Sequence, residues 1–156
     1  MQHTCRLKLN SLFQILLQPF YKKTLTGKAD FAAAGISITE ERTQQFLFTP
    51  AYHKITEQVI YRSGKKRPKK ASDLLNGILE IVNGTSHAET LKQLQKNTPQ
   101  LQWQTNEALN TDGLLYLVNE RLIDYTIADS NQMTLIRRFY PKLNIAFNIA
   151  PPMALA

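Results

Sequence analysis

Gly84, Thr85 and Ser86 form a loop whose residue types could bind an anion. They follow the apolar run from Ile78 to Val82 and precede a segment with helical spacing. Glycine lets a ligand approach the backbone, and two hydroxyls beside the free N–H groups of a helix start suit a carboxylate or phosphate. Ser86 with Glu89 three residues later also fits a capping box, which taken alone is the commoner use of this pattern.

Asp129 and Arg42 are the two charged side chains that could complete such a site. Asp129 ends an apolar segment, where its carboxylate could accept an ammonium group; capping the next helix is an equally good interpretation. Arg42 lies on a short expected helix, where its guanidinium could grip a carboxylate with two hydrogen bonds. Taken alone, the commoner interpretation of Arg42 is a surface ion pair with Glu40 or Glu41.

Several kinds of catalytic and metal chemistry are not predicted. The sequence has no Gly-rich phosphate loop and no Gly-x-Ser-x-Gly elbow. His3, His53 and His87 lack the spacing of metal ligands, so no metal site is expected. Cys5 is the single cysteine, which excludes an internal disulfide and a cysteine-based metal site. We therefore predict no cofactor and no complete catalytic apparatus within this sequence.

Composition and charge limit the partners. The chain has 156 residues and a formal net charge of +7. No apolar run approaches the ~18 residues that a membrane span needs. The basic run 65–70 lacks interleaved aromatic residues and lies between two expected strands, which favours a solvated loop over nucleic-acid binding. The apolar segment 12–17 is interrupted and followed by no cleavage site, so no signal peptide is predicted.

Strands and helices alternate from residue 72 onward. The expected strands are 78–82, 101–104, 123–129 and 144–149, and the expected helices between them are 87–96, 112–120 and 132–139. Two earlier strands are expected at 31–35 and 56–62. This order predicts an α/β fold with a mostly parallel sheet covered on both faces. Ligands of such sheets bind outside the carboxyl ends of the strands, which is where Gly84–Ser86 and Asp129 fall.

Longer motifs carry a resemblance to a known family. The stretch from Gly27 to Arg42, followed by Phe48 to Tyr52, resembles the family-3 extracellular solute-binding domain. That family has the pattern G-K-x-D…G-x-[ST]-x-T-x-E-R…F-[ST]-x-P-Y, and here Ala51 stands between the proline and the tyrosine. The stretches 66–68, 84–91 and 123–131 resemble, more narrowly, the N-terminal domain of membrane-bound lytic murein transglycosylase F. The resemblance covers roughly residues 25–156.

The resemblance implies a periplasmic-binding-protein-like fold of type II, with two lobes and mainly parallel sheets. On that basis residues 1–23 are an unmatched N-terminal segment and 24–62 are a partial first lobe with its hinge strand. Residues 63–142 are the second lobe, and 143–156 are a truncated strand returning toward the first. The first lobe is therefore expected to be incomplete and to expose apolar residues.

The resemblance also implies a ligand and the residues that bind it. In the family, the arginine of the T-x-E-R motif, here Arg42, holds the carboxylate of a small zwitterion. Groups at Ser37, Thr85 and Ser86 assist it, and Asp129 receives the ligand amine. The expected ligand is an amino acid or a cell-wall peptide.

Three functions remain open. The first is the regulatory module of a peptidoglycan lytic transglycosylase, whose lysozyme-like catalytic domain is missing here and would supply the contact with peptidoglycan. The second is a periplasmic amino-acid receptor of an ABC transporter. The third, an enzyme cleaving peptidoglycan by itself, is disfavoured by the missing catalytic domain. The resemblance implies a location in the periplasm and, for the transglycosylase subgroup, association with the outer membrane.

Overall fold

The computed structural model describes residues 23–32 and 35–156, which divide into two compact units. The first unit runs to His53 and also includes Ala154–Ala156, and the second unit is Lys54–Met153. These bounds differ from the expected lobes, which divided the chain at 62/63 and 142/143. The expected N-terminal segment and the histidine and cysteine within it lie outside the described residues, apart from residue 23.

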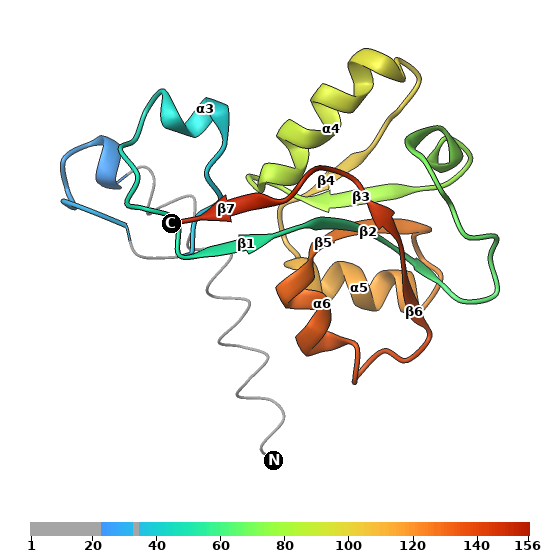
Figure 1. Cartoon of the computed structure of the whole chain (residues 1–156). Helices are drawn as coiled ribbons and strands as arrows, with labels where there is room; N and C mark the ends of the chain where they lie inside the picture. The colour runs from blue at the N-terminus through green and yellow to red at the C-terminus, as the bar shows by residue number, and fades with distance from the viewer. Residues whose placement is uncertain (1–22, 33–34) are drawn as a thin grey trace. The chain divides into compact units, whose positions relative to one another are not determined.

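The second unit contains a five-stranded sheet. Its strands are β2 (Glu57–Arg62), β3 (Leu79–Val82), β4 (Gln104–Asn106), β5 (Tyr125–Asp129) and β6 (Leu143–Asn148), in the order β4-β3-β5-β2-β6 (Figure 1). β3 is parallel to β4 and β5, whereas β2 is antiparallel to both β5 and β6. Four strands therefore run in one direction and only β2 opposes them, which agrees with a mainly parallel sheet.

Helices join the parallel strands as the sequence predicts. They are α4 (Ser86–Asn97), α5 (Thr111–Asn119) and α6 (Ser130–Ile136), with a short 3-10 turn, η1 (Ala71–Leu74), before β3. The Asn110 side chain caps α5 by accepting the Gly113 N–H at 2.9 Å. Figure 1 shows α4 on one side of the sheet and α5 and α6 on the other. None of the described helices is both long enough and apolar enough to span a membrane.

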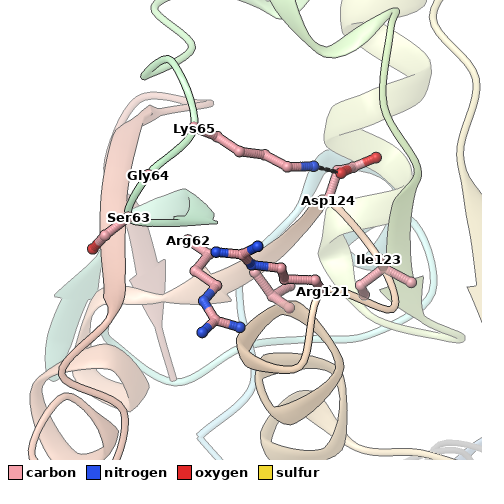
Figure 2. A pocket seen from close by; sticks show the side chains of 8 residues that line it. Arg62, Ser63, Gly64, Lys65, Arg121, Ile123 and Asp124 are labelled. Atoms are coloured by element: carbon pink, nitrogen blue, oxygen red, sulfur yellow. Dashed lines mark hydrogen bonds and ion pairs between the residues drawn. The ribbon is translucent and has the colours of Figure 1, made fainter.

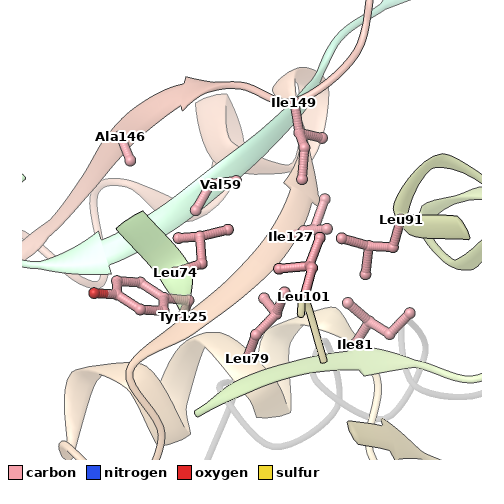
Figure 3. Close-up of a cluster of buried hydrophobic side chains, with 10 residues drawn as sticks. All are labelled: Val59, Leu74, Leu79, Ile81, Leu91, Leu101, Tyr125, Ile127, Ala146 and Ile149. Atoms are coloured by element: carbon pink, nitrogen blue, oxygen red, sulfur yellow. The ribbon is translucent and has the colours of Figure 1, made fainter. Parts of the chain in front are cut away.

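Side-chain alternation along the strands builds a core on each face of the sheet. Val59, Ile81 and Ile127 pack in the cluster that includes Leu91 of α4 (Figure 3). Their neighbours in the same strands, such as Ile60, pack in the second cluster with the leucines of α5. Successive strand residues point to opposite faces, so each of these strands contributes to both cores. Because helices cover both faces of the sheet, these strands carry apolar residues at successive positions.

β2 and β6 pair within the sheet of the second unit. The sequence analysis expected residues 24–62 to hold a partial first lobe with its hinge strand, and residues 143–156 to return toward that lobe. β2 lies between β5 and β6 in the second unit, whereas Ala154–Ala156 belong to the first unit. β4 begins at Gln104 rather than at Leu101, whose side chain is fully buried in the core.

The first unit is built around a short backbone pairing. Ser37 bridges Leu155, and the N–H groups of Ile36 and Ile38 donate to carbonyls at the end of the chain at 2.9 Å. β1 (His53–Ile55) and β7 (Met153–Leu155) form a separate two-stranded sheet. Part of the expected strand 31–35 lies outside the described residues, and its other residues are in no strand.

Large apolar side chains are exposed in the first unit. Phe31, Leu47 and Tyr52 are all mainly exposed. They border an open hollow of about 830 Å³ that lies within this unit. Ile36 and Leu155 are among the buried apolar residues here.

The Asp73 carboxylate holds the backbone at the end of the basic run by two hydrogen bonds. Its Oδ2 accepts the Lys69 N–H at 2.8 Å and the Lys70 N–H at 3.3 Å. The hydrogen bond from Lys69, helped by that from Lys70, lowers the pKa of the Asp73 carboxyl against the opposing effect of desolvation. A lowered folded-state pKa stabilises the protein above the unfolded pKa of about 3.9, and this stabilisation is lost as pH falls through the folded value.

We therefore expect Asp73→Asn to lower the thermal unfolding midpoint at pH 7, with a difference from the parent chain that shrinks below about pH 4. Melting curves followed by circular dichroism at pH 7 and pH 3 measure this. An equal difference at both pH values would contradict a role for the ionised carboxylate.

Candidate functional site

One edge of the second unit's sheet gathers the ends of three strands. β3 ends at Val82 and β5 ends at Asp129, while the antiparallel β2 begins there with Glu57. The register places Glu57 directly opposite Asp129. Because α4 and α6 start after β3 and β5, the two loops singled out in the sequence lie at this edge, as the strand order predicts.

The loop between β3 and α4 turns through Gly84, whose φ of 74° is in the left-handed region. Thr85, with extended backbone, is the N-cap of α4, and its hydroxyl donates to the Val82 carbonyl at 2.8 Å. Ser86 is the first residue of the helix. The interpretation of Ser86 as the N-cap, paired with Glu89 in a capping box, is therefore wrong. The N-cap is the preceding residue, Thr85.

The Ser86 hydroxyl instead contacts a buried acid. It donates to Oε1 of Glu57 at 2.7 Å, and both side chains are buried. The other oxygen of Glu57, Oε2, has no hydrogen-bond partner within residues 23–32 and 35–156. A fully buried carboxylate with one oxygen unsatisfied is costly unless a cation or donor compensates it.

An imidazole lies between this acid and Asp129. Nε2 of His87, in the first turn of α4, is 3.2 Å from Oδ1 of Asp129 and 4.0 Å from Oε1 of Glu57. His87 is 2% exposed, and the Asp129 side chain is 20% exposed. We call Glu57, Ser86, His87 and Asp129 the edge cluster. It combines two carboxylates with one imidazole and is reached from solvent at Asp129.

Asp129 takes one of the two roles that the sequence left open, that of a helix cap. It is the N-cap of α6, and its backbone N–H donates to Oε1 of Gln132 at 3.2 Å. Its carboxylate also faces His87. Capping therefore does not exclude a second role for the carboxylate.

The remaining predicted site residues, Ser37 and Arg42, lie in the first unit. Arg42 is half-buried on α3 (Glu40–Thr43), and the Thr39 hydroxyl caps that helix by accepting the Arg42 N–H at 3.3 Å. Nη1 of Arg42 donates to the Ser37 carbonyl at 3.1 Å. The structure thus forms two groups of predicted residues: Ser37 with Arg42 in one unit, and Thr85, Ser86 and Asp129 in the other.

Glu57 and His87 were missed by the sequence analysis. His87 was judged by its distance along the chain from other histidines, whereas its neighbours here come from other elements. Glu57 carried a usable signal, because it stands two residues before Val59 and so shares that residue's covered face of the strand. An acid at an inward position of a strand is an indicator of a buried polar site.

A small basic pocket lies at the opposite end of β2. It has a volume of about 240 Å³, and Figure 2 shows Arg62, Lys65 and Arg121 around it. Arg62 donates to the Asn119 carbonyl, and Lys65 forms an ion pair with Asp124. Since two of these cations already have partners within the chain, the edge cluster is the stronger candidate for a functional site.

The sequence matches the bacterial extracellular solute-binding proteins, family 3, over residues 17–127. It is 36% identical over 155 residues to membrane-bound lytic murein transglycosylase F 1 of Alkalilimnicola ehrlichii, covering 99% of this chain and 31% of the relative. It is 38% identical over 134 residues to membrane-bound lytic murein transglycosylase F of Saccharophagus degradans, covering 86% of this chain and 27% of the relative. The chain thus spans about a third of these relatives' length.

Solved structures show the same fold at low sequence identity. Holo ArgBP from T. maritima superimposes with a TM-score of 0.70 at 20% identity, covering 86% of this chain and 57% of that one. The arginine-, lysine-, histidine-binding protein ArtJ from Geobacillus stearothermophilus gives 0.73 at 19%, with 94% and 67% covered. A solute receptor for L-cysteine of Neisseria gonorrhoeae gives 0.74 at 18%, with 87% and 53% covered. The expected periplasmic-binding-protein-like α/β fold of type II is therefore confirmed.

Proposed function

The chain belongs to the bacterial extracellular solute-binding proteins, family 3, and on this premise we propose that it binds an amino acid or a short cell-wall peptide. The observation that carries the proposal is the edge of the second unit's sheet. There the carboxylate of Asp129, partly open to solvent, lies close to the first turn of a twelve-residue helix. A carboxylate suits the ligand amine, and a helix start suits the ligand carboxylate or a peptide carbonyl.

The side-chain roles follow from the hydrogen bonds already present. The hydroxyls of Thr85 and Ser86 donate to Val82 and Glu57. Their part in binding is therefore to offer lone pairs and to hold the helix start in position. Asp129 is the proposed partner of the amine. Arg42, with Ser37 beside it, is the proposed partner of a carboxylate, because a guanidinium can make two parallel hydrogen bonds.

The relatives suggest a wider setting. Relatives 36% and 38% identical in sequence are named membrane-bound lytic murein transglycosylases and are about three times as long as this chain. We therefore propose that the chain acts as a ligand-sensing module linked to peptidoglycan cleavage in the periplasm, at the outer membrane. The catalytic step would belong to a lysozyme-like domain.

A transporter receptor is the second candidate. It is favoured by the shared fold with structures described as arginine-binding and as a receptor for L-cysteine. The two candidates differ in ligand size, since a receptor for transport would prefer a free amino acid and a cell-wall sensor would prefer a peptide or muropeptide.

Isothermal titration calorimetry tests the proposal. We expect the chain to bind at least one member of a panel of L-amino acids and purified muropeptides with millimolar or tighter affinity. Asp129→Asn, which keeps the shape and removes the charge, should weaken binding at least about tenfold, since hydrogen bonds to charged groups contribute about 1.5–3 kcal/mol. Arg42→Lys should also weaken it, because lysine cannot form the bidentate contact.

The matched control is Glu120→Gln, which removes the charge of an exposed carboxylate at the C-terminal end of α5. Thermal unfolding of each variant shows whether it is folded. No heat with any ligand at about millimolar concentration, or equal affinities for Asp129→Asn and the parent chain, would overturn the proposal.

A further inference from the structure

The edge cluster brings together three side chains of the kind that bind transition metals. Glu57 comes from β2, His87 from α4 and Asp129 from the end of β5. One potential ligand atom from each lies within 4.8 Å of the others. We propose that these three residues form a binding site for a divalent metal ion of the zinc type, which shares Asp129 with the proposed amino-acid site and binds the ion in the absence of an amino acid.

The distances approach those that such an ion requires. Bonds of about 2.0–2.2 Å in tetrahedral geometry place neighbouring ligand atoms roughly 3.3–3.5 Å apart. Nε2 of His87 is 3.2 Å from Oδ1 of Asp129 and 4.0 Å from Oε1 of Glu57, and the three ligand atoms all lie within 4.8 Å of one another. Bringing all three onto one ion therefore requires the wider separations to close by up to about 1.4 Å through side-chain rotation.

The donor set selects the class of metal. One imidazole nitrogen with two carboxylate oxygens suits zinc, which accepts both kinds of ligand. Calcium and magnesium take oxygen ligands almost exclusively and in larger numbers. Three protein ligands leave one tetrahedral position for water or for a group of a bound molecule.

Glu57 supplies an independent observation. Its side chain is 0% exposed, and its Oε2 has no hydrogen-bond partner within the described part of the chain. Ser86 donates to its other oxygen and fixes the orientation of the carboxylate, as residues behind metal ligands commonly do. A metal ion at this point would compensate a buried negative charge that the surrounding groups satisfy only in part.

The competing account is a simple ion pair in which a protonated His87 is held between the two carboxylates. It explains the same distances but predicts no metal binding. A metal titration separates the two accounts.

The test is calorimetric titration of ZnCl2 into the full chain after treatment with EDTA and desalting. The chain carries His3→Gln and Cys5→Ser, so that these residues outside the described region cannot bind the ion. We expect one zinc ion to bind per chain and neither Mg²⁺ nor Ca²⁺ to compete. His87→Gln and Glu57→Gln should each weaken zinc binding at least about tenfold, whereas His53→Gln, on the exposed start of β1, should not.

Thermal unfolding gives a second measurement that does not depend on calorimetric heats. Zinc should raise the midpoint of the parent chain and of His53→Gln, and not that of His87→Gln. If His87→Gln does not fold, Asp129→Asn takes its place. Absence of zinc binding, or equal binding by parent and cluster variants, overturns the proposal in favour of the ion pair. No amino acid is present, so the outcome is independent of whether the proposed ligand binds.

Discussion

Leu91→Ala is expected to lower the free energy of unfolding by about 3 kcal/mol, because deletion of a buried leucine side chain typically costs 2–5 kcal/mol. Leu91 lies in the middle of α4 and is fully buried against Ile81, Ile127 and Leu101 (Figure 3). Alanine would leave a cavity between this helix and the sheet. Alanine and leucine both favour helices, so the loss reports packing rather than helix propensity.

Leu135→Ala is the matched control. Leu135 also lies within a helix, α6, but its side chain is 70% exposed. Its replacement should change the free energy of unfolding by less than about 0.5 kcal/mol. Urea unfolding followed by circular dichroism measures both variants at equal protein concentration. Similar losses for the two variants would show that α4 is not packed on the sheet as the structure has it.

Leu91 also illustrates what the sequence could predict. The spacing of Leu91 and Leu94 indicated a helix facing a core, and Leu91 is fully buried while Leu94 packs at the margin of the cluster. The alternation of strands and helices predicted the sheet, and with it the edge where Thr85 and Asp129 lie. These features depend on local periodicity, which the sequence shows directly.

The edge cluster could not be predicted in the same way. Glu57 meets Asp129 only because β2 enters the sheet antiparallel to β5 in one particular register. No local pattern specifies that register, and a shift by one residue would turn Glu57 to the other face of the sheet. His87 stands in the first turn of α4, which begins one residue earlier than expected, with Thr85 rather than Ser86 at the cap.

The position of β6 depends on contacts of the same long-range kind. The family resemblance implied that residues 143–156 return toward the first lobe; Ala154–Ala156 belong to the first unit, while the sheet of the second unit holds β6. Its partner is β2, through pairs such as Ile60 with Ile145. The choice between two possible sheets depends on side chains distant in sequence, here the buried Ala146 and Leu143, which pack on opposite faces of the second unit's sheet.

Gly77→Ala is expected to destabilise the second unit by about 1–3 kcal/mol, the usual cost of overpacking a filled site. Gly77 lies in the connection between η1 and β3, where its N–H donates to the Leu74 carbonyl at 3.2 Å. A Cβ added here would lie 2.5 Å from Cε2 of Tyr125 and 3.0 Å from Cβ of Asp124. Both distances are shorter than a carbon–carbon van der Waals contact of about 3.5–4.0 Å.

The neighbours of Gly77 have little freedom to move away. Tyr125 is buried in the core cluster, and the Asp124 carboxylate accepts the Ile78 N–H at 2.7 Å. Asn76→Ala, an exposed change in the same connection, should leave stability almost unchanged. Urea unfolding of both variants measures the difference. Equal stability of Gly77→Ala and Asn76→Ala would mean that the start of β5 does not pack against this turn. That packing matters for the site, because it fixes the first residue of β5, Tyr125, and Asp129 is the last residue of the same strand.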